Sequence, residues 1–122
     1  MKTILLVDDE EDFHRILKRV IEPTGYLAVS AMSAEEGLRM LEAFTPGLAI
    51  VDWNLPGMSG LEFVKKFRSL PKFAKVPVIM YTVRDSEDEQ ISAYSADIQA
   101  YLNKPVSPAI LLAKIKQLLH NT

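Results

Sequence analysis

The sequence lacks several residues and patterns that many functional sites require. It contains no cysteine, which excludes disulfide bonds and thiolate metal sites. Its two histidines, His14 and His120, lie near opposite ends of the chain, so we expect both on the surface and expect no histidine-based site. Its five glycines form no GxGxxG pattern, so the sequence has no dinucleotide-binding fingerprint. All apolar runs fall far below the roughly 20 residues of a membrane-spanning helix, so no membrane association is expected.

An excess of charge of one sign is also missing. Lys and Arg number 14 and Asp and Glu number 16, which gives a formal net charge of −2. Nucleic-acid binding requires a positively charged surface, so we expect no direct binding of nucleic acid by this chain. The first residues, MKTI, lack the apolar segment and cleavage site of a signal peptide. These features predict a cytoplasmic protein.

The sequence does contain a regular alternation of two apolar patterns. Continuous apolar runs predict strands at 4–7, 26–29, 48–51, 76–81 and 101–102. Apolar residues spaced three or four apart predict helices within 13–21, 34–44, 61–67, 87–96 and 111–119. A length of 122 residues fits one domain. The alternation therefore predicts an α/β domain with a parallel sheet covered by helices on both faces.

Serines mark most of the expected helix starts. Three of them are followed three residues later by a glutamate, as in a capping box: Ser33 with Glu36, Ser59 with Glu62, and Ser86 with Glu89. Ser107 precedes Pro108, and proline is favoured at the first position of a helix. Each of these starts has a side chain that satisfies backbone amides left free by the helix.

Polar side chains follow four of the five expected strands. Asp8 and Asp9 follow the first strand, Asp52 the third, Thr82 the fourth and Lys104 the fifth. Open α/β sheets bind ligands beyond the carboxyl ends of their strands, near the point where the strand order reverses. If the first and third strands are neighbours, the three aspartates converge at that edge.

Such a group of acids requires either raised pKa values of the carboxyl groups or a bound cation. Two carboxylates about 4 Å apart repel each other by about 4 kcal/mol at an effective dielectric constant of about 20. The available ligands are oxygens, which favour Mg²⁺, and Mg²⁺ leaves room for a phosphate group. Lys104 adds a fixed positive charge and Thr82 a hydroxyl. Together these groups suit phosphoryl transfer, in which a carboxylate acts as the nucleophile.

The pattern resembles the receiver domains of two-component response regulators, in particular the chemotaxis-type receivers. The resemblance covers about residues 2–119 and rests on Asp8-Asp9, the segment DWNLPGMSG at 52–60, Thr82, and Lys104-Pro105 with Tyr101 three residues before the lysine. It implies a single receiver domain over residues 1–122 with a flavodoxin-like (βα)5 fold. In that fold the strand order is 2-1-3-4-5.

The resemblance also implies an acceptor and a metal site. Asp52 would accept a phosphoryl group from a phosphohistidine on a sensor histidine kinase or a phosphotransfer protein. Asp9, Asp52 and the backbone carbonyl of Asn54 would bind Mg²⁺, and Asp8 would act directly or through water. We expect the following acids, Glu10, Glu11 and Asp12, to complement the dipole of the next helix rather than bind metal.

The remaining family residues would form the switch. Lys104 would pair with the phosphoryl oxygens, and its peptide bond to Pro105 would be cis. Thr82 would hydrogen-bond the phosphoryl group and move toward it, and Tyr101 would turn inward into the vacated space. The chain would thus catalyse its own phosphorylation and dephosphorylation without being a turnover enzyme.

The fourth helix and fifth strand are the expected mobile elements. The segment from Ser86 to Asp97 offers only Ile91, Tyr94 and a few alanines to the core, and a weakly buried helix opens at low cost. Phosphorylation adds charge and acceptor oxygens that bias such an element. The face formed by helix four, strand five and helix five would then control an output partner, and it would also serve a homodimer.

Two positions depart from the family pattern, and at two others the family varies the rate of dephosphorylation. Val83 replaces the usual alanine or glycine and is expected to narrow phosphoryl access. Asn54 and Arg84 occupy the two positions where the family tunes dephosphorylation. Asp97 stands where glycine is common, and aspartate tolerates a left-handed backbone better than most residues.

Two other functions remain as alternatives. An aspartate-nucleophile phosphatase of the haloacid dehalogenase type would carry a second aspartate two residues after the nucleophile, where this chain has Asn54. A pure interaction module would keep the fold but accept no phosphate. The output is also open, because the chain fits either a stand-alone receiver or a receiver followed by an effector domain.

Overall fold

The computed structural model describes residues 2–120 and confirms the predicted alternation. The strands are β1 (Thr3–Val7), β2 (Leu27–Ala31), β3 (Leu48–Val51), β4 (Val78–Thr82) and β5 (Ala100–Asn103). The α-helices are α1 (Glu11–Ile21), α2 (Ala34–Met40), α3 (Gly60–Ser69), α4 (Glu87–Ser95) and α5 (Pro108–His120). Two 3₁₀ turns, Glu22–Thr24 and Pro71–Phe73, follow α1 and α3. The strands are parallel in the order β2-β1-β3-β4-β5, which is the flavodoxin-like order.

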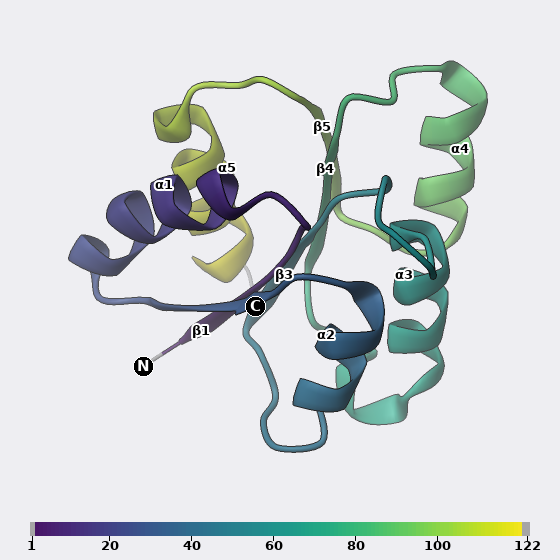
Figure 1. Ribbon diagram of the computed structural model, residues 1–122, viewed down its shortest axis with the longest axis horizontal. Coiled ribbons are helices and arrows are strands. Elements are labelled where there is room, and N and C mark those ends of the chain that lie inside the picture. Colours follow the sequence, from purple (N-terminus) through teal and green to yellow (C-terminus); the bar gives the residue numbers. More distant parts are fainter. Residues whose placement is uncertain (1, 121–122) are drawn as a thin grey trace.

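Helices cover both faces of the sheet, as Figure 1 shows. Helices α2, α3 and α4 pack on one face around Phe63, Phe67 and Ala93. Helices α1 and α5 pack on the other around Leu17 and Ile115. The strands are buried on both faces because side chains alternate between these two cores, which is why their sequences read as continuous apolar runs.

The four serines begin their helices as predicted, but only one forms a complete capping box. Ser33, Ser59 and Ser86 each accept a hydrogen bond from the amide three residues on, and Ser107 accepts one from the amide of Ile110. Of these helix starts, only that at Ser86 has the reciprocal bond, in which the serine amide donates to the glutamate carboxylate. At α2, Glu36 instead accepts a hydrogen bond from the amide of Met32. The bond expected there from the Ser33 amide to Glu36 is therefore a wrong prediction.

Two details of the sequence prediction are wrong. Helix α2 ends at Met40 rather than near residue 44, because the amides of Glu42 and Ala43 bond carbonyls three residues back and tighten the chain into a turn. In α4, Ile91 and Tyr94 are 55% and 49% exposed instead of facing the core. Helix α4 is therefore even more weakly buried than its sequence indicated.

Among the described residues, none of the helices has the length and apolar character to cross a bilayer.

Candidate functional site

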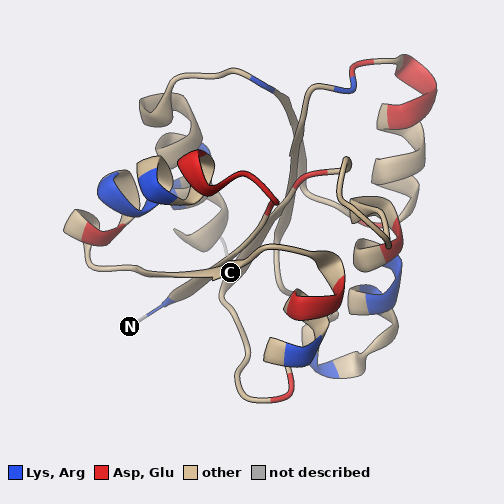
Figure 2. Ribbon diagram, in the orientation of Figure 1, with Lys and Arg blue, Asp and Glu red and all other residues tan. Residues whose placement is uncertain are grey.

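The polar residues that end β1 and β3 meet at the carboxyl edge of the sheet. Val7 pairs with Val51, so Asp8 and Asp52 follow directly on neighbouring strands. The amide of Asp52 donates to the carbonyl of Val7, which continues the ladder up to the acidic residues. Figure 2 shows the two acidic segments side by side at the centre of the molecule. The predicted convergence of these two aspartates is confirmed.

Lys104 connects the acids. Its Nζ lies 2.7 Å from Oδ2 of Asp8, 3.0 Å from Oδ2 of Asp52 and 3.3 Å from Oε1 of Glu10. The side chains of Asp8 and Asp52 are only 1% and 7% exposed, and that of Lys104 is 13% exposed. The ammonium therefore supplies the positive charge that two buried carboxylates require.

Burial and ion pairing oppose each other in this group. Burial raises the pKa of the Asp8 carboxyl, and hydrogen bonds from Lys104 and from the Glu10 amide offset this only in part. Burial alone would lower the pKa of the Lys104 ammonium, but hydrogen bonds to Asp8 and Asp52 outweigh burial and raise it. Lys104 is thus held charged, whereas the ionised form of Asp8 is disfavoured.

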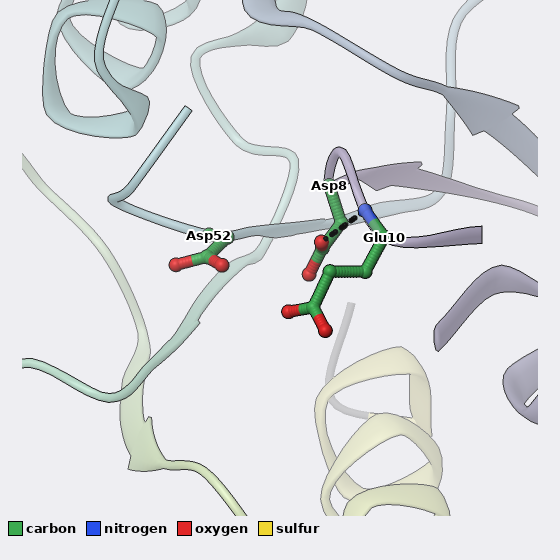
Figure 3. A group of neighbouring side chains, drawn as sticks. All are labelled: Asp8, Glu10 and Asp52. Carbon is green, nitrogen blue, oxygen red and sulfur yellow. Dashed lines mark hydrogen bonds between the residues drawn. The ribbon is translucent and has the colours of Figure 1, made fainter. Parts of the chain in front are cut away.

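Three acids form a group with the geometry of a metal site. Oxygen atoms of Asp8, Glu10 and Asp52 lie within 4.8 Å of one another. Figure 3 shows the carboxyl groups of Asp8 and Glu10 side by side, with Asp52 next to them. Oxygen donors at this spacing suit a hard divalent cation such as Mg²⁺.

The acid that joins the group is Glu10, while Asp9 is exposed and lies outside it. Glu10 precedes the first turn of α1, with an extended backbone at φ −95° and ψ 114°. Glu10 is thus the N-cap residue and not part of the first turn as predicted, and its carboxylate lies 3.3 Å from Nζ of Lys104. Glu11 and Asp12 do lie in the first turn of α1. The role of Asp9 as a metal ligand stays a prediction.

The loop after β3 is ordered around the Asp52 carboxylate. The amide of Asn54 donates to Oδ1 of Asp52 at 3.1 Å, and the amide of Gly60 donates to the carbonyl of Trp53 at 2.9 Å. Trp53 is half-buried, and the guanidinium carbon of Arg84 lies 5.4 Å from the centre of its ring. The loop after β3 thus contacts both α3 and the loop after β4.

The loop after β4 places Thr82, Arg84 and Tyr101 together. Thr82 is fully buried, and its Oγ1 accepts a hydrogen bond from the Arg84 amide at 3.4 Å. The hydroxyl of Tyr101 donates to the Arg84 carbonyl at 2.8 Å, and the ring is half-buried. Val83 is 62% exposed. The movement of Thr82 and Tyr101 and the effect of Val83 on access stay predictions.

Two backbone predictions are confirmed. The peptide bond between Lys104 and Pro105 is cis. Asp97 has a φ of 72°, which is the left-handed conformation that aspartate was expected to tolerate there. Arg68 donates from Nε to the Asp97 carbonyl at 2.7 Å and holds this turn in place.

His14 is buried, so its predicted surface position is wrong, whereas His120 is exposed. The Nε2 of His14 donates to the backbone carbonyl of Asp8 at 2.7 Å. His14 shares the buried face of α1 with Leu17 and Ile21, while Ile16 is 45% exposed. The spacing of positions 14, 17 and 21 was the signal that the sequence interpretation missed.

A comparison with known families shows to which family the chain belongs. The model of the response regulator receiver domain matches residues 4–116, which is most of the chain. The chain belongs to the response regulator receiver family. Receiver domains are signalling switches in two-component systems and not turnover enzymes, so membership implies phosphorylation-dependent signalling.

Relatives of the receiver domain fall into two groups. The chain is 36% identical to the chemotaxis protein CheY1 of Helicobacter pylori over 120 residues, and the match covers 95% of each protein. It is 32% identical to the phosphate regulon regulatory protein PhoB of Pseudomonas aeruginosa, where the match covers 99% of the chain but 53% of PhoB. The chain thus spans about half the length of its PhoB relatives and nearly all of CheY.

A solved receiver structure has the same fold. The CheY-like receiver domain protein of Methanospirillum hungatei superposes with a TM-score of 0.93 and 35% identity. The alignment covers 99% of this chain and 95% of that one. The receiver fold therefore extends over practically the whole described chain.

Sequence reasoning missed one further residue near the receiver site. Glu89, interpreted only as a helix cap, accepts a hydrogen bond from Nη1 of Arg84 at 2.6 Å. Nε of the same arginine donates to Oδ1 of Asn54 at 2.6 Å. Asn54 and Arg84, the two positions predicted to tune dephosphorylation, are therefore in direct contact. No spacing rule could indicate this, because Arg84 lies in a loop and its partners come from other elements.

Proposed function

We propose that this receiver domain is a phosphorylation-dependent switch that accepts a phosphoryl group on Asp52. The observation that carries the proposal is the contact of Lys104 with both Asp8 and Asp52 at the ends of neighbouring strands. This contact supports the proposal because a buried carboxylate can act as a nucleophile and a fixed cation beside it can stabilise phosphoryl oxygens. A carboxylate oxygen of Asp52 forms the new bond to phosphorus. The phosphorus–nitrogen bond of the donor phosphohistidine breaks, and its electron pair leaves with the imidazole.

Mg²⁺ is the proposed cofactor. The oxygen atoms of Asp8, Glu10 and Asp52 fit a hard divalent cation in type and spacing. We assign Asp8, Asp9, Asp52 and the backbone carbonyl of Asn54 as its ligands, as the family resemblance implies. When bound, the ion neutralises charge on the phosphoryl oxygens. Lys104 and Thr82 contact the other phosphoryl oxygens, and Tyr101 responds to the movement of Thr82.

The partners follow from this role. The donor is a sensor histidine kinase or a phosphotransfer protein in the cytoplasm, and the chain catalyses both its phosphorylation and its dephosphorylation. The receiver domain comprises residues 1–122. The weakly buried α4 forms a face with β5 and α5, and phosphorylation changes this face. The changed face binds an output partner, an effector domain or a second copy of the chain.

Phosphoryl labelling tests the acceptor. With a small phosphodonor and Mg²⁺, we expect intact-mass analysis to show one added phosphoryl group on the wild type and none on Asp52→Asn. The substitution removes the nucleophilic oxygen while keeping nearly the same shape. A wild type that gains no mass, or a labelled Asp52→Asn variant, would contradict the switch. Steady release of phosphate from many substrates would favour a phosphatase.

Thermal unfolding with Mg²⁺ tests the metal site. A ligand that binds only the folded state stabilises it by mass action, by about 2.7 kcal/mol at 100 times its Kd. We expect Mg²⁺ to raise the Tm of the wild type and to leave that of Asp9→Ala unchanged. Glu10→Ala is the matched comparison, and we expect it to keep a Mg²⁺-dependent rise. An undiminished rise in Asp9→Ala would remove Asp9 from the site.

A further inference from the structure

The backbone around Lys104 is held in place by two neighbouring residues of β4. The Lys104 amide donates to the carbonyl of Thr82 at 2.8 Å. Two residues further on, the Val106 amide donates to the side-chain hydroxyl of Tyr81 at 3.0 Å. Pro105, which lies between them, has no amide hydrogen to donate. Both amide donors of this short segment are therefore bound to β4, one to its backbone and the other to a side chain.

The ring of Tyr81 also lies beside the end of the Lys104 side chain. Nζ of Lys104 lies over the Phe13 ring at 5.1 Å from its centre, and it is 5.6 Å from the centre of the Tyr81 ring. The centres of the two rings are 5.8 Å apart. A cation within about 6 Å of a ring centre is attracted by the ring, and more strongly where water is excluded. Because Tyr81 is buried, this attraction acts in a largely water-free environment.

Three carboxylates compete for the same ammonium. Nζ lies 2.7 Å from Asp8 and 3.0 Å from Asp52, but it also lies 3.3 Å from Glu10, whose side chain is 65% exposed. A lysine side chain is a flexible four-carbon stem, so ion pairs alone leave several positions open to its ammonium. Contacts that hold both the backbone and the ammonium of Lys104 reduce this freedom.

We propose that Tyr81 and Phe13 are positioning residues for Lys104. The Tyr81 hydroxyl fixes the backbone after Lys104, and the two rings hold the ammonium beside Asp52. This role rests on the proposed function, in which Lys104 stabilises charge on the phosphoryl oxygens. A displaced ammonium stabilises that charge less well, so phosphorylation of Asp52 slows.

Tyr81→Phe tests the hydroxyl while a ring stays in place. The proteins are mixed with acetyl phosphate and Mg²⁺, and the initial rate of labelling is followed by intact mass. In the reaction an oxygen of Asp52 forms a bond to phosphorus, the bond from phosphorus to the acetate oxygen breaks, and its electron pair leaves with acetate. We expect the rate to fall about two- to tenfold, as for the loss of one hydrogen bond.

Phe13→Leu tests the rings separately. Leucine keeps an apolar side chain at this position but removes the ring over which Nζ of Lys104 lies. We expect the initial rate of labelling to fall about two- to fivefold, as for the loss of one contact between a cation and a ring. A rate equal to that of the wild type would contradict the role of the rings.

The NMR signals of the Lys104 Cε methylene report the position of the side chain directly. They are identified by their absence from Lys104→Met, and the neighbouring rings shift them away from the signals of exposed lysines. Because Tyr81→Phe keeps both rings, a smaller shift in this variant means that Lys104 has moved. We expect this decrease in Tyr81→Phe, in the absence of phosphodonor and Mg²⁺.

Thr24→Val is the matched control for a lost hydrogen bond. The Thr24 hydroxyl donates to the Ile21 carbonyl at the carboxyl end of α1, whereas the site lies at the other end of this helix. Valine keeps the shape of threonine without the hydroxyl. The Tm should fall in both Thr24→Val and Tyr81→Phe, but the labelling rate and the Lys104 signals of Thr24→Val should stay those of the wild type.

Three results would overturn the role of Tyr81. They are a wild-type labelling rate in Tyr81→Phe, unchanged Lys104 signals in that variant, and an equal slowing in Thr24→Val. Any of them, with a wild type that is labelled normally, rejects this role alone. A wild type that gains no phosphoryl group rejects the proposed acceptor, and the Lys104 signals then still show whether Tyr81 positions the lysine.

Discussion

Replacing Gly60 by alanine is expected to destabilise the fold and to impair phosphorylation together. A Cβ on Gly60 would meet the carbonyl oxygen of Asp52 far inside contact distance, with the Asp52 carbonyl carbon at 2.7 Å and the Trp53 Cα at 2.9 Å. All three atoms belong to the backbone and cannot rotate away. The start of α3 must therefore separate from the acceptor loop, which loses the bond from the Gly60 amide to Trp53.

The effect of Gly60→Ala should be large in two measurements. In urea unfolding we expect a loss of about 3 kcal/mol, as for an overpacked site, even though alanine favours helix by up to about 1 kcal/mol. The initial rate of labelling should fall by about tenfold or more, because a displacement of about 1 Å in a catalytic group can slow a reaction about 100-fold.

Gly47→Ala is the matched control. The nearest atoms to a Cβ there belong to Leu119 and Lys2, at 3.5 Å, which is ordinary contact. We expect its unfolding free energy to stay within about 0.5 kcal/mol of the wild type. A Gly60→Ala protein that unfolds at the wild-type urea concentration would show that the loop can shift freely, contrary to this account.

Replacing Lys104 by methionine should produce the second large effect. The change keeps most of the apolar stem but leaves Asp8 and Asp52, which are buried, without their cation. Breaking a buried ion pair from one side costs about 3 to 5 kcal/mol. We expect a loss of about 3 kcal/mol in urea unfolding at pH 7 without divalent metal. Labelling of Asp52 should also slow strongly.

The pH dependence of Lys104→Met gives a sharper test. Burial already raises the pKa of Asp8 in the wild type, and removing Lys104 removes the contact that opposes this rise. The folded variant then binds a proton at pH values where the unfolded chain has released it. Its stability should therefore increase as the pH falls through the raised pKa toward the ordinary aspartate value of about 4.

Lys114→Met is the control for a lost surface charge. Lys114 lies on α5 and contacts only Gln117 among the hydrogen bonds of the described residues. We expect a change within about 0.5 kcal/mol and no gain in stability on acidification relative to the wild type. If Lys104→Met behaves like this control, Asp8 and Asp52 do not need Lys104 to remain buried. The contact of Lys104 with the two aspartates would then no longer support the proposed function.

The sequence predicted the architecture well because the relevant signals are local or topological. Apolar periodicity distinguishes strands from helices, and the parallel arrangement places all strand ends at one edge. Asp8, Asp52 and Lys104 could therefore be brought together without coordinates. Their contacts in the structure show that these three residues do lie together.

Apart from the end of α2, the errors concern the directions of individual side chains. Glu10 was expected in the first turn of α1, yet it is the N-cap residue and its carboxylate lies 3.3 Å from Nζ of Lys104. Ile91 and Tyr94 were assigned to the core, yet both face solvent. Apolar type predicts burial only on average, and a short helix that packs through a single alanine leaves its larger residues outside.

The amino-acid sequence by itself determined the fold class, the strand ends that carry the chemistry and the family to which the chain belongs. These depend on residue type and spacing, which are present in the one-dimensional chain. Only the tertiary structure decided that Arg84 joins Asn54 to Glu89 and that His14 supports the Asp8 carbonyl. Such contacts link loops and helices whose relative positions are set by packing of the whole sheet, and long polar side chains then select partners that sequence spacing does not indicate.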